Sequence, residues 1–207
     1  SLNLGGTEDS SENIAENRKR ALSDLNITMD QVSYLNQIHS NIVCQAVVGK
    51  QTGDALVTNK PGLALAVGAA DCYPILFHDD KNKIIGAAHC GWRGTLNRIV
   101  KNAIHEMVKL GAEKKYIKMA IGQGICVQNY QVSLDVILQF REQGFPEYCW
   151  DERQMDLLKA NEFVALESGI LKENMWSMGR CTTEADFFSY RRDSGKTGRM
   201  WALIMLK

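Results

Sequence analysis

The chain has 207 residues, of which 45% are apolar and 23% charged, ordinary values for a single globular domain with a substantial core. Lys and Arg together number 24, as do Asp and Glu, so the formal net charge is zero. This balance, without any basic tract, excludes the charge pattern typical of a nucleic-acid-binding protein, and no apolar run has the length of a membrane span.

The six cysteines are scattered through the chain without close spacing, and no signal peptide is visible. Such usage is typical of a protein whose thiols stay reduced, in contrast to the disulfide framework of a small secreted domain. We therefore expect a cytoplasmic protein.

A helix is expected first, over residues 10–25, because apolar side chains recur there on one face. Asp9 and Glu12 resemble a capping box at its beginning. Five apolar stretches follow that are typical of strands, separated by turns rich in Gly, Pro and Asp. They cover residues 32–35, 41–48, 63–69, 73–77 and 83–89.

The clearest helical periodicity lies at 95–111, where Thr95 is placed to cap the helix and Gly111 to end it. The remaining pattern predicts a strand at 116–122, helices at 133–143 and 153–168, and a last strand at 199–206. Strands dominate the first half, and their connections are too short for a regular alternation of strands and helices. The sequence thus favours one α+β domain with a mixed sheet, over residues 1–207, rather than a doubly wound fold.

Four histidines are present, and two of them stand where a surface position is expected. His105 lies on the polar side of the helix predicted at 95–111, and His78 precedes two aspartates at a turn. His39 and His89 lie instead at the ends of predicted strands. A single histidine at either place is more often a hydrogen-bonded structural residue than a ligand.

Cys72 stands where one apolar strand meets the next. Most free cysteines are small buried apolar residues, but the neighbouring Asp71 weakens that interpretation, because a carboxylate beside the core needs a partner. Together with His39 and His89, the Cys72 thiolate could bind one metal ion and leave the fourth tetrahedral position of zinc open, as in catalytic sites. The three residues are far apart along the chain and match no local ligand motif, so spacing alone leaves both interpretations open.

The stretch "HCGWRG" at 89–94 places Arg93 between two glycines. A guanidinium group is suited to a phosphate or carboxylate, and the helix predicted to follow adds backbone N–H donors for an anion. A surface ion pair at a tight turn is the alternative. The loop "SYRRDSGKTGR" at 189–199 is a second stretch rich in Arg and Gly.

Together these stretches resemble a family named after a laccase domain or a multicopper polyphenol oxidase. Its members have since been described as zinc-dependent purine nucleoside phosphorylases with adenosine deaminase activity. The matching stretches run in the family's order from residue 1 to residue 199. They are "SLNLG", "ENR", "QIHS", "GDALVT", "ADCYPILF", "GAAHCGWRG", "YQV", "CT", "FFSYRRD" and "TGR".

The resemblance implies a mixed β-sandwich flanked by helices. It places the family's metal ligands on His39, Cys72 and His89, with zinc as the expected ion and copper as an alternative. It also implies that Arg18, in "ENR", contacts the ligand.

The chain departs from the family pattern at four positions, which are Ser40, Cys90, Gln123 and Gln131. The family usually has Gly, Ala, Pro and Glu there. Members also carry a strand and a Gly-rich, Arg-containing segment before "SLNLG", so we expect this domain to lack its N-terminal segment.

The activity implied by the resemblance is phosphorolysis of adenosine, inosine, guanosine and methylthioadenosine, together with deamination of adenosine. Zinc lowers the pKa of a bound water, and Asp71 is the candidate for the accompanying acid–base group. The phosphate is expected at Arg93, with help from Arg18 or Arg191. The expected partners are therefore purine nucleosides and phosphate, without nucleic acid or membrane, for a monomer or homodimer.

Three alternatives remain open. A metal-free cysteine hydrolase would use Cys72 as nucleophile and His89 as base, but it would leave His39 without a role. A copper-dependent polyphenol oxidase would match the family's older name, although four histidines are too few for several copper centres. A protein that keeps the domain only as a scaffold for a partner is the third.

Overall fold

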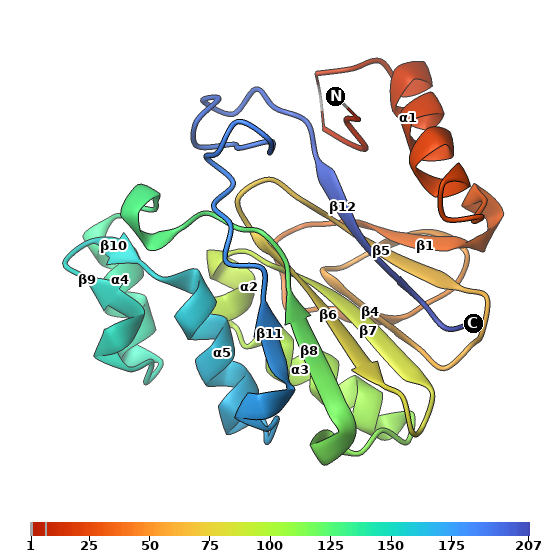
Figure 1. Cartoon of the computed structure of the whole chain (residues 1–207). Coiled ribbons are helices and arrows are strands. Elements are labelled where there is room, and N and C mark those ends of the chain that lie inside the picture. Colours follow the sequence, from red (N-terminus) through yellow and green to blue (C-terminus); the bar gives the residue numbers. More distant parts are fainter. Residues whose placement is uncertain (1, 7) are drawn as a thin grey trace.

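The protein is built of two β-sheets packed face to face, with helices on both outer sides (Figure 1). The computed structural model describes residues 2–6 and 8–207. Helix α1 lies against the outer face of one sheet, and the later helices lie against the outer face of the other. This arrangement confirms the α+β fold, a mixed β-sandwich flanked by helices.

The larger sheet has six strands and combines parallel and antiparallel pairs. Its order is β11 (Met175–Ser177), β8 (Ile117–Ile121), β6 (Tyr73–Asp79), β7 (Ile84–Cys90), β4 (Ala55–Thr58) and β2 (Val43–Gln45). The antiparallel pairs join β8 to β6, β6 to β7 and β7 to β4, whereas both edge strands pair in parallel. The centre of this sheet is therefore a run of neighbouring strands that bury both faces.

The smaller sheet has four strands, in the order β12 (Met200–Met205), β5 (Ala64–Ala69), β1 (Val32–Asn36) and β3 (Gly49–Thr52). Strand β12 runs antiparallel to β5, so the last strand of the chain closes one side of this sheet. Strands β9 (Trp150–Asp151) and β10 (Gln154–Met155) form a separate antiparallel pair.

Strand β7 shows how the sandwich is filled. Ile85 and Ala87 face the smaller sheet and join the apolar core between the sheets, whereas Ile84 and Ala88 join the core beneath the helices. Because successive side chains of a strand point to opposite faces, a strand buried on both sides needs a continuous apolar run. The run "IIGAA" meets that need and carries the chain to His89.

The helices are α1 (Ser11–Ser23), α2 (Trp92–Leu96), α3 (Ile99–Lys109), α4 (Leu134–Glu142) and α5 (Leu157–Glu167). Helix α1 begins one residue later than the predicted capping box requires. Ser10 is the N-cap and accepts a hydrogen bond from the backbone N–H of Asn13, whereas Asp9 accepts one from Asn3. The capping box at Asp9 and Glu12 was therefore a wrong prediction.

The helix predicted at 95–111 is interrupted. Arg98 adopts a left-handed conformation, with φ of 61°, and separates α2 from α3. Its guanidinium donates hydrogen bonds to Glu167 and to the backbone oxygen of Gln143, and it stacks on Phe145. These contacts with residues distant in the sequence stabilise the break between α2 and α3. The apolar periodicity of residues 95–111 gives no indication of them.

Thr95 does not cap the helix, because α2 begins at Trp92 after the N-cap Gly91. The Thr95 side chain is buried within α2 and donates a hydrogen bond to Asn161 of α5. "GWRG" is therefore mostly helical, and Arg93 lies in the first turn of α2.

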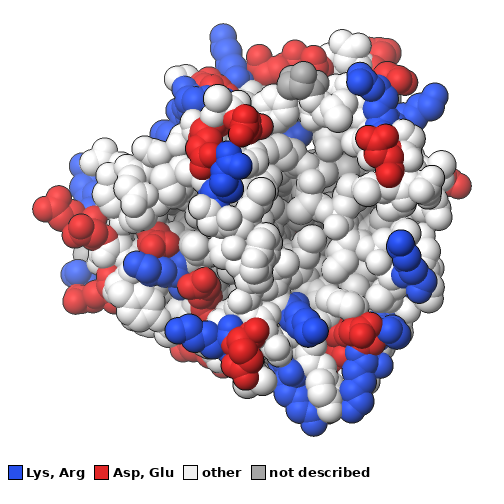
Figure 2. Space-filling view, viewed as in Figure 1, with Lys and Arg blue, Asp and Glu red and all other residues white. Residues whose placement is uncertain are grey.

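Positive and negative side chains alternate around the edge of the face shown in Figure 2, and neither sign gathers into a patch. This distribution agrees with the zero net charge. Within residues 2–6 and 8–207, none of the helices combines the length and the apolar character needed to cross a membrane.

Candidate metal centre

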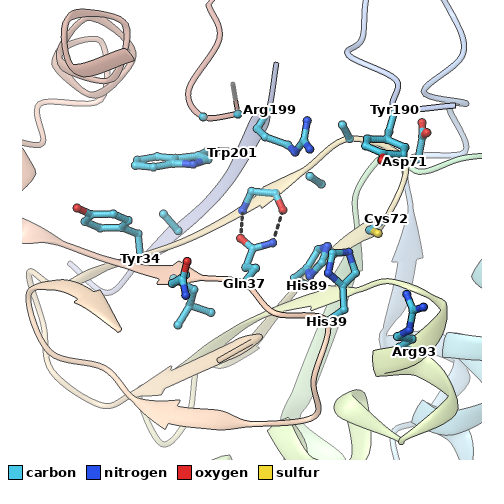
Figure 3. Close-up of a pocket in the computed structure, with 18 of the residues that line it drawn as sticks. Tyr34, Gln37, His39, Asp71, Cys72, His89, Arg93, Tyr190, Arg199 and Trp201 are labelled. Atoms are coloured by element: carbon cyan, nitrogen blue, oxygen red, sulfur yellow. Dashed lines mark hydrogen bonds between the residues drawn. The ribbon is translucent and has the colours of Figure 1, made fainter. Parts of the chain in front are cut away.

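The two sheets bring His39, Cys72 and His89 together at one end of the sandwich (Figure 3). His39 follows β1 of the smaller sheet, and His89 lies near the end of β7 of the larger one. Cys72 stands in the connection through which the chain passes from β5 to β6. One ligand atom from each lies within 4.8 Å of the others, and the two imidazole rings meet edge to face.

A buried carboxylate holds both histidines. Asp54, at the start of β4, accepts hydrogen bonds from the backbone N–H groups of His39 and Ser40 at 3.0 and 2.6 Å. Its Oδ1 also lies 2.9 Å from Nδ1 of His89. His39 has a φ of 58°, a left-handed conformation that costs a residue with a Cβ free energy, and the bonds to Asp54 fix it there.

The same contacts determine which ring nitrogen of His89 is free. Because Nδ1 faces the Asp54 carboxylate, Nε2 is the atom left for a metal, an arrangement common among histidine ligands. Burial would raise the pKa of Asp54, but hydrogen bonds from His89 and Ser40 outweigh it and lower that pKa to about 2. Asp54 thus stays charged.

The three donors also influence one another. Burial would raise the pKa of the Cys72 thiol, yet the charge of His89 and hydrogen bonds from both histidines lower it to about 6. Burial would lower the pKa of His89, but the Cys72 thiolate and Asp54 raise it to about 9. The surroundings therefore favour the thiolate, which is the form of cysteine that binds metals.

The donor set fits a transition-metal ion such as zinc. Zinc takes imidazole nitrogen and thiolate sulfur at about 2.0–2.3 Å, which places donors around one ion about 3.3–3.8 Å apart. The three ligand atoms here lie within 4.8 Å of one another, close to that spacing. Within the part of the chain that the structure describes, the group has three members, so a zinc ion held by them would have its fourth position open to water or substrate.

Cys90 does not face this site. It follows His89 along β7, so its side chain points to the opposite face of the sheet and joins the core under the helices. The next residue is Gly91, and the structure leaves no room for a side chain there. A Cβ there would lie 2.8 Å from Cys72 Sγ and 3.1 Å from the His39 ring, so a side chain would displace two of the three donors.

The three donors lie on the wall of a cavity of about 710 Å³, within the usual range of about 300–1,000 Å³ for small-molecule sites. Its far end is aromatic, with Tyr34 and Trp201 at a centroid distance of 5.8 Å. The Arg18 guanidinium stacks over both rings, and its Nε donates to the backbone oxygen of Leu4. Figure 3 shows Tyr34 and Trp201 at the end away from the two histidines and Cys72, and the contacts with both rings place Arg18 at that end of the cavity wall.

The wall between the aromatic end and the metal donors is fixed by a paired contact. The Gln37 side chain donates to the backbone oxygen of Gly68 and accepts from its N–H, both at 2.7 Å. Figure 3 shows this pair beside the two histidines.

Arg93 and Arg191 also line the cavity, nearer to the three donors. They differ in whether the guanidinium is already hydrogen-bonded. Arg93 stacks on Trp92 at 4.3 Å, and its guanidinium makes no hydrogen bond or ion pair with the described residues. Arg191 donates instead to the backbone oxygens of Asn129 and Gln131. Arg93 is therefore available to a ligand, whereas Arg191 already shapes the wall.

Asp71 lies beside Cys72 with a φ of 83°, another left-handed conformation. Its two oxygens accept hydrogen bonds of 2.6 Å from the Thr182 hydroxyl and from the backbone N–H of Arg191. These contacts tie the segment after β11 to the edge of the cavity and supply the partner that the Asp71 carboxylate needs.

Sequence reasoning did not single out Asp54, Trp201 or Arg199, although all three belong to this region. For Asp54 the sequence does contain an indication of its role. It precedes the buried strand "ALVT", and the argument applied to Asp71, that a carboxylate beside the core needs a partner, applies equally to it. Trp201 lies inside an apolar strand and gives no such signal.

Asp54→Asn is expected to weaken zinc binding by about 10–100-fold, because the amide cannot match the charge of the carboxylate toward His89 and the backbone of the 38–40 loop. Competition with a chromogenic chelator measures the affinity. Asp135→Asn, an exposed change on α4, is the matched control. An unchanged zinc affinity in Asp54→Asn would contradict the role given to this carboxylate.

The family model described as "Multi-copper polyphenol oxidoreductase laccase" matches residues 1–207. A purine nucleoside phosphorylase from Deinococcus radiodurans is 46% identical over 209 residues, covering 99% of this chain and 82% of that protein. The adenosine deaminase RL5, from an unknown prokaryotic organism, is 32% identical over 163 residues, covering 74% of this chain and 62% of that protein.

Solved structures give the same relationship. The crystal structure of YlmD from Geobacillus stearothermophilus has a TM-score of 0.94 at 30% identity, covering 100% of this chain and 85% of that one. The sandwich and the full-length match agree with each other, and the chain belongs to the multi-copper polyphenol oxidoreductase laccase family.

Proposed function

We propose that the protein is a zinc-dependent enzyme of purine nucleosides, which cleaves them with phosphate and also deaminates adenosine. The observation that carries the proposal is the meeting of His39, Cys72 and His89 on the wall of a cavity large enough for a nucleoside. Relatives named purine nucleoside phosphorylase and adenosine deaminase support the same substrate class.

In this proposal zinc is held by His39, Cys72 and His89, and when bound it supplies a Lewis acid that polarises a ligand in the open position. The aromatic end of the cavity, formed by Tyr34 and Trp201, offers stacking surfaces for a purine ring. Polar groups along the wall would then fix the orientation of the ribose.

Arg93 is the proposed phosphate anchor. Among the described residues its guanidinium makes no hydrogen bond or ion pair, it lines the cavity, and two parallel N–H groups match two phosphate oxygens. Arg191 contributes positive charge from a position fixed by backbone carbonyls, whereas Arg18 is held at the aromatic end of the cavity. The anchor is the side chain of Arg93 rather than the N-terminus of α2, a helix of only five residues.

For Asp71 we propose a positioning role in preference to the acid–base role predicted from the sequence. Both of its oxygens already accept hydrogen bonds, one from Thr182 and one from the backbone of Arg191. Asp71 therefore holds the wall segment that carries Arg191 beside Cys72.

Product analysis with adenosine and inosine tests the proposal. Release of adenine and hypoxanthine that depends on added phosphate would support phosphorolysis, and release of ammonia from adenosine would support deamination. The absence of free base, ribose 1-phosphate and ammonia from the zinc-loaded enzyme would overturn the proposal.

Arg93→Ala is expected to raise the KM for phosphate about 10–100-fold, which corresponds to the loss of about 1.5–3 kcal/mol for a charged hydrogen bond. The KM for the nucleoside should change far less. Initial rates over a range of phosphate concentrations measure both constants, with the exposed Arg141→Ala on α4 as the control. An unchanged phosphate KM would remove Arg93 from the anion site.

A cysteine hydrolase is the second candidate, because the geometry also contains a nucleophile, a base and an orienting acid. Cys72 lies beside His89, whose Nδ1 contacts Asp54, and these surroundings favour the thiolate. In that mechanism the exposed His39, which completes the group of donors, would only help to stabilise the thiolate and would take no part in proton transfer. A multicopper oxidase is not supported, since His105 lies exposed on α3 and His78 near Asp80.

A further inference from the structure

Two cysteines outside the metal centre lie together where two distant segments meet. Cys126 follows β8, and Cys181 follows β11, the strand that pairs with β8. Beyond the paired strands, Gly124 and Cys181 form a parallel bridge, and the Thr182 N–H donates to the Gly124 oxygen at 3.0 Å. The backbone therefore holds these two segments side by side.

The two sulfur atoms share their surroundings. The Cys126 N–H donates to Cys181 Sγ at 3.1 Å. Asn129 Nδ2 lies 3.2 Å from Cys126 Sγ and 3.6 Å from Cys181 Sγ. Both residues are half-buried rather than enclosed in the core.

We propose that Cys126 and Cys181 are a redox modification site, at which a low-molecular-weight disulfide such as oxidised glutathione converts the two thiols into an intramolecular disulfide. A disulfide needs a sulfur–sulfur distance of about 2.05 Å, and the two Sγ atoms already lie around one amide nitrogen, Asn129 Nδ2, at 3.2 and 3.6 Å. The proposal does not depend on the reaction catalysed in the cavity.

The chemistry assigns different roles to the two thiols. Burial would raise the pKa of Cys181, but hydrogen bonds from Cys126 and Thr183 lower it to about 7, whereas burial raises the pKa of Cys126. The Cys181 thiolate attacks one sulfur of the oxidant and expels a glutathione thiolate. The deprotonated Cys126 then attacks Cys181 Sγ and expels the second, so two thiols are oxidised while one disulfide is reduced to two thiols.

Cys126 and Cys181 each adjoin a segment that contacts the cavity wall. Cys181 directly precedes Thr182, whose hydroxyl donates to Asp71 at the cavity. Cys126 begins the loop whose Asn129 oxygen accepts from Arg191. A disulfide would therefore tether the two segments that form this side of the cavity.

The experiment treats the zinc-loaded protein with oxidised glutathione, followed by alkylation under denaturing conditions and non-reducing peptide mapping. Of the six cysteines, four should remain free, the 126–181 peptide should appear, and dithiothreitol should reverse both changes. Cys44→Ser removes another half-buried thiol and should leave the 126–181 linkage unchanged.

The single variants separate the two roles. Cys126→Ser should stop at a mixed disulfide between Cys181 and glutathione, whereas Cys181→Ser should leave Cys126 largely unmodified. A different pair of linked cysteines, or thiols 126 and 181 that stay free under these conditions, would overturn the proposal.

Discussion

Replacing His39 by alanine is expected to lower the zinc content of the purified protein from about one ion per chain to a trace. In the proposed site His39 would supply one of the three donors, and the described residues offer no substitute close to Cys72 and His89. Phosphate-dependent release of base should disappear with the metal. Metal analysis by mass spectrometry measures the first effect and chromatography of the products the second.

The variant should stay folded, because His39 is exposed and the hydrogen bonds to Asp54 come from the backbone of its loop. Zinc at 100 times its Kd should stabilise the wild type by about 2.7 kcal/mol and the variant not at all. His39→Asn, which tolerates the left-handed conformation, is a second variant, and the exposed His105→Ala on α3 is the control. A His39→Ala protein with a full complement of zinc would show that the ligand set is wrong.

The Cys72→Ser and Cys72→Asp variants should separate a metal ligand from a nucleophile. Serine is a poor zinc ligand, so Cys72→Ser should lose both metal and activity. A carboxylate does bind zinc, so Cys72→Asp should keep part of the zinc and part of the activity, although it has no thiol.

The activity of the metal-depleted wild-type protein distinguishes these two roles of Cys72. In the proposed enzyme the metal-depleted protein is inactive, because Cys72 acts through the metal. Activity that survives metal removal and is lost in both Cys72 variants would favour the cysteine hydrolase, in which His89 activates the thiol.

The fold was predictable where local patterns are strong. The apolar run before His89 and the one at 63–69 predicted β7 and β5 to within about two residues. The break before α3 was not predictable, because it depends on Arg98 reaching Glu167 and the backbone oxygen of Gln143. Contacts with residues so distant in the sequence cannot be recognised from the periodicity of apolar residues in a helix.

The candidate site was only partly predictable, because its residues come together from distant parts of the sequence. His39, Cys72 and His89 each stand at the end of an apolar run, and the resemblance to a family supplied their convergence, which spacing could not. Asp54 was missed although it lies next to a buried strand, since its partners are His89 and the loop around Ser40. The orientation of Cys90 could have been inferred, because neighbours on a strand face opposite sides.

The most direct test of the account is the removal and restoration of zinc in the wild-type protein, with adenosine or inosine and phosphate as substrates. We expect about one zinc per chain, loss of base release on treatment with a strong chelator, and recovery on adding back one equivalent of zinc. Copper added in place of zinc shows which ion supports the reaction. Base release that continues at full rate in protein free of metal would contradict the account.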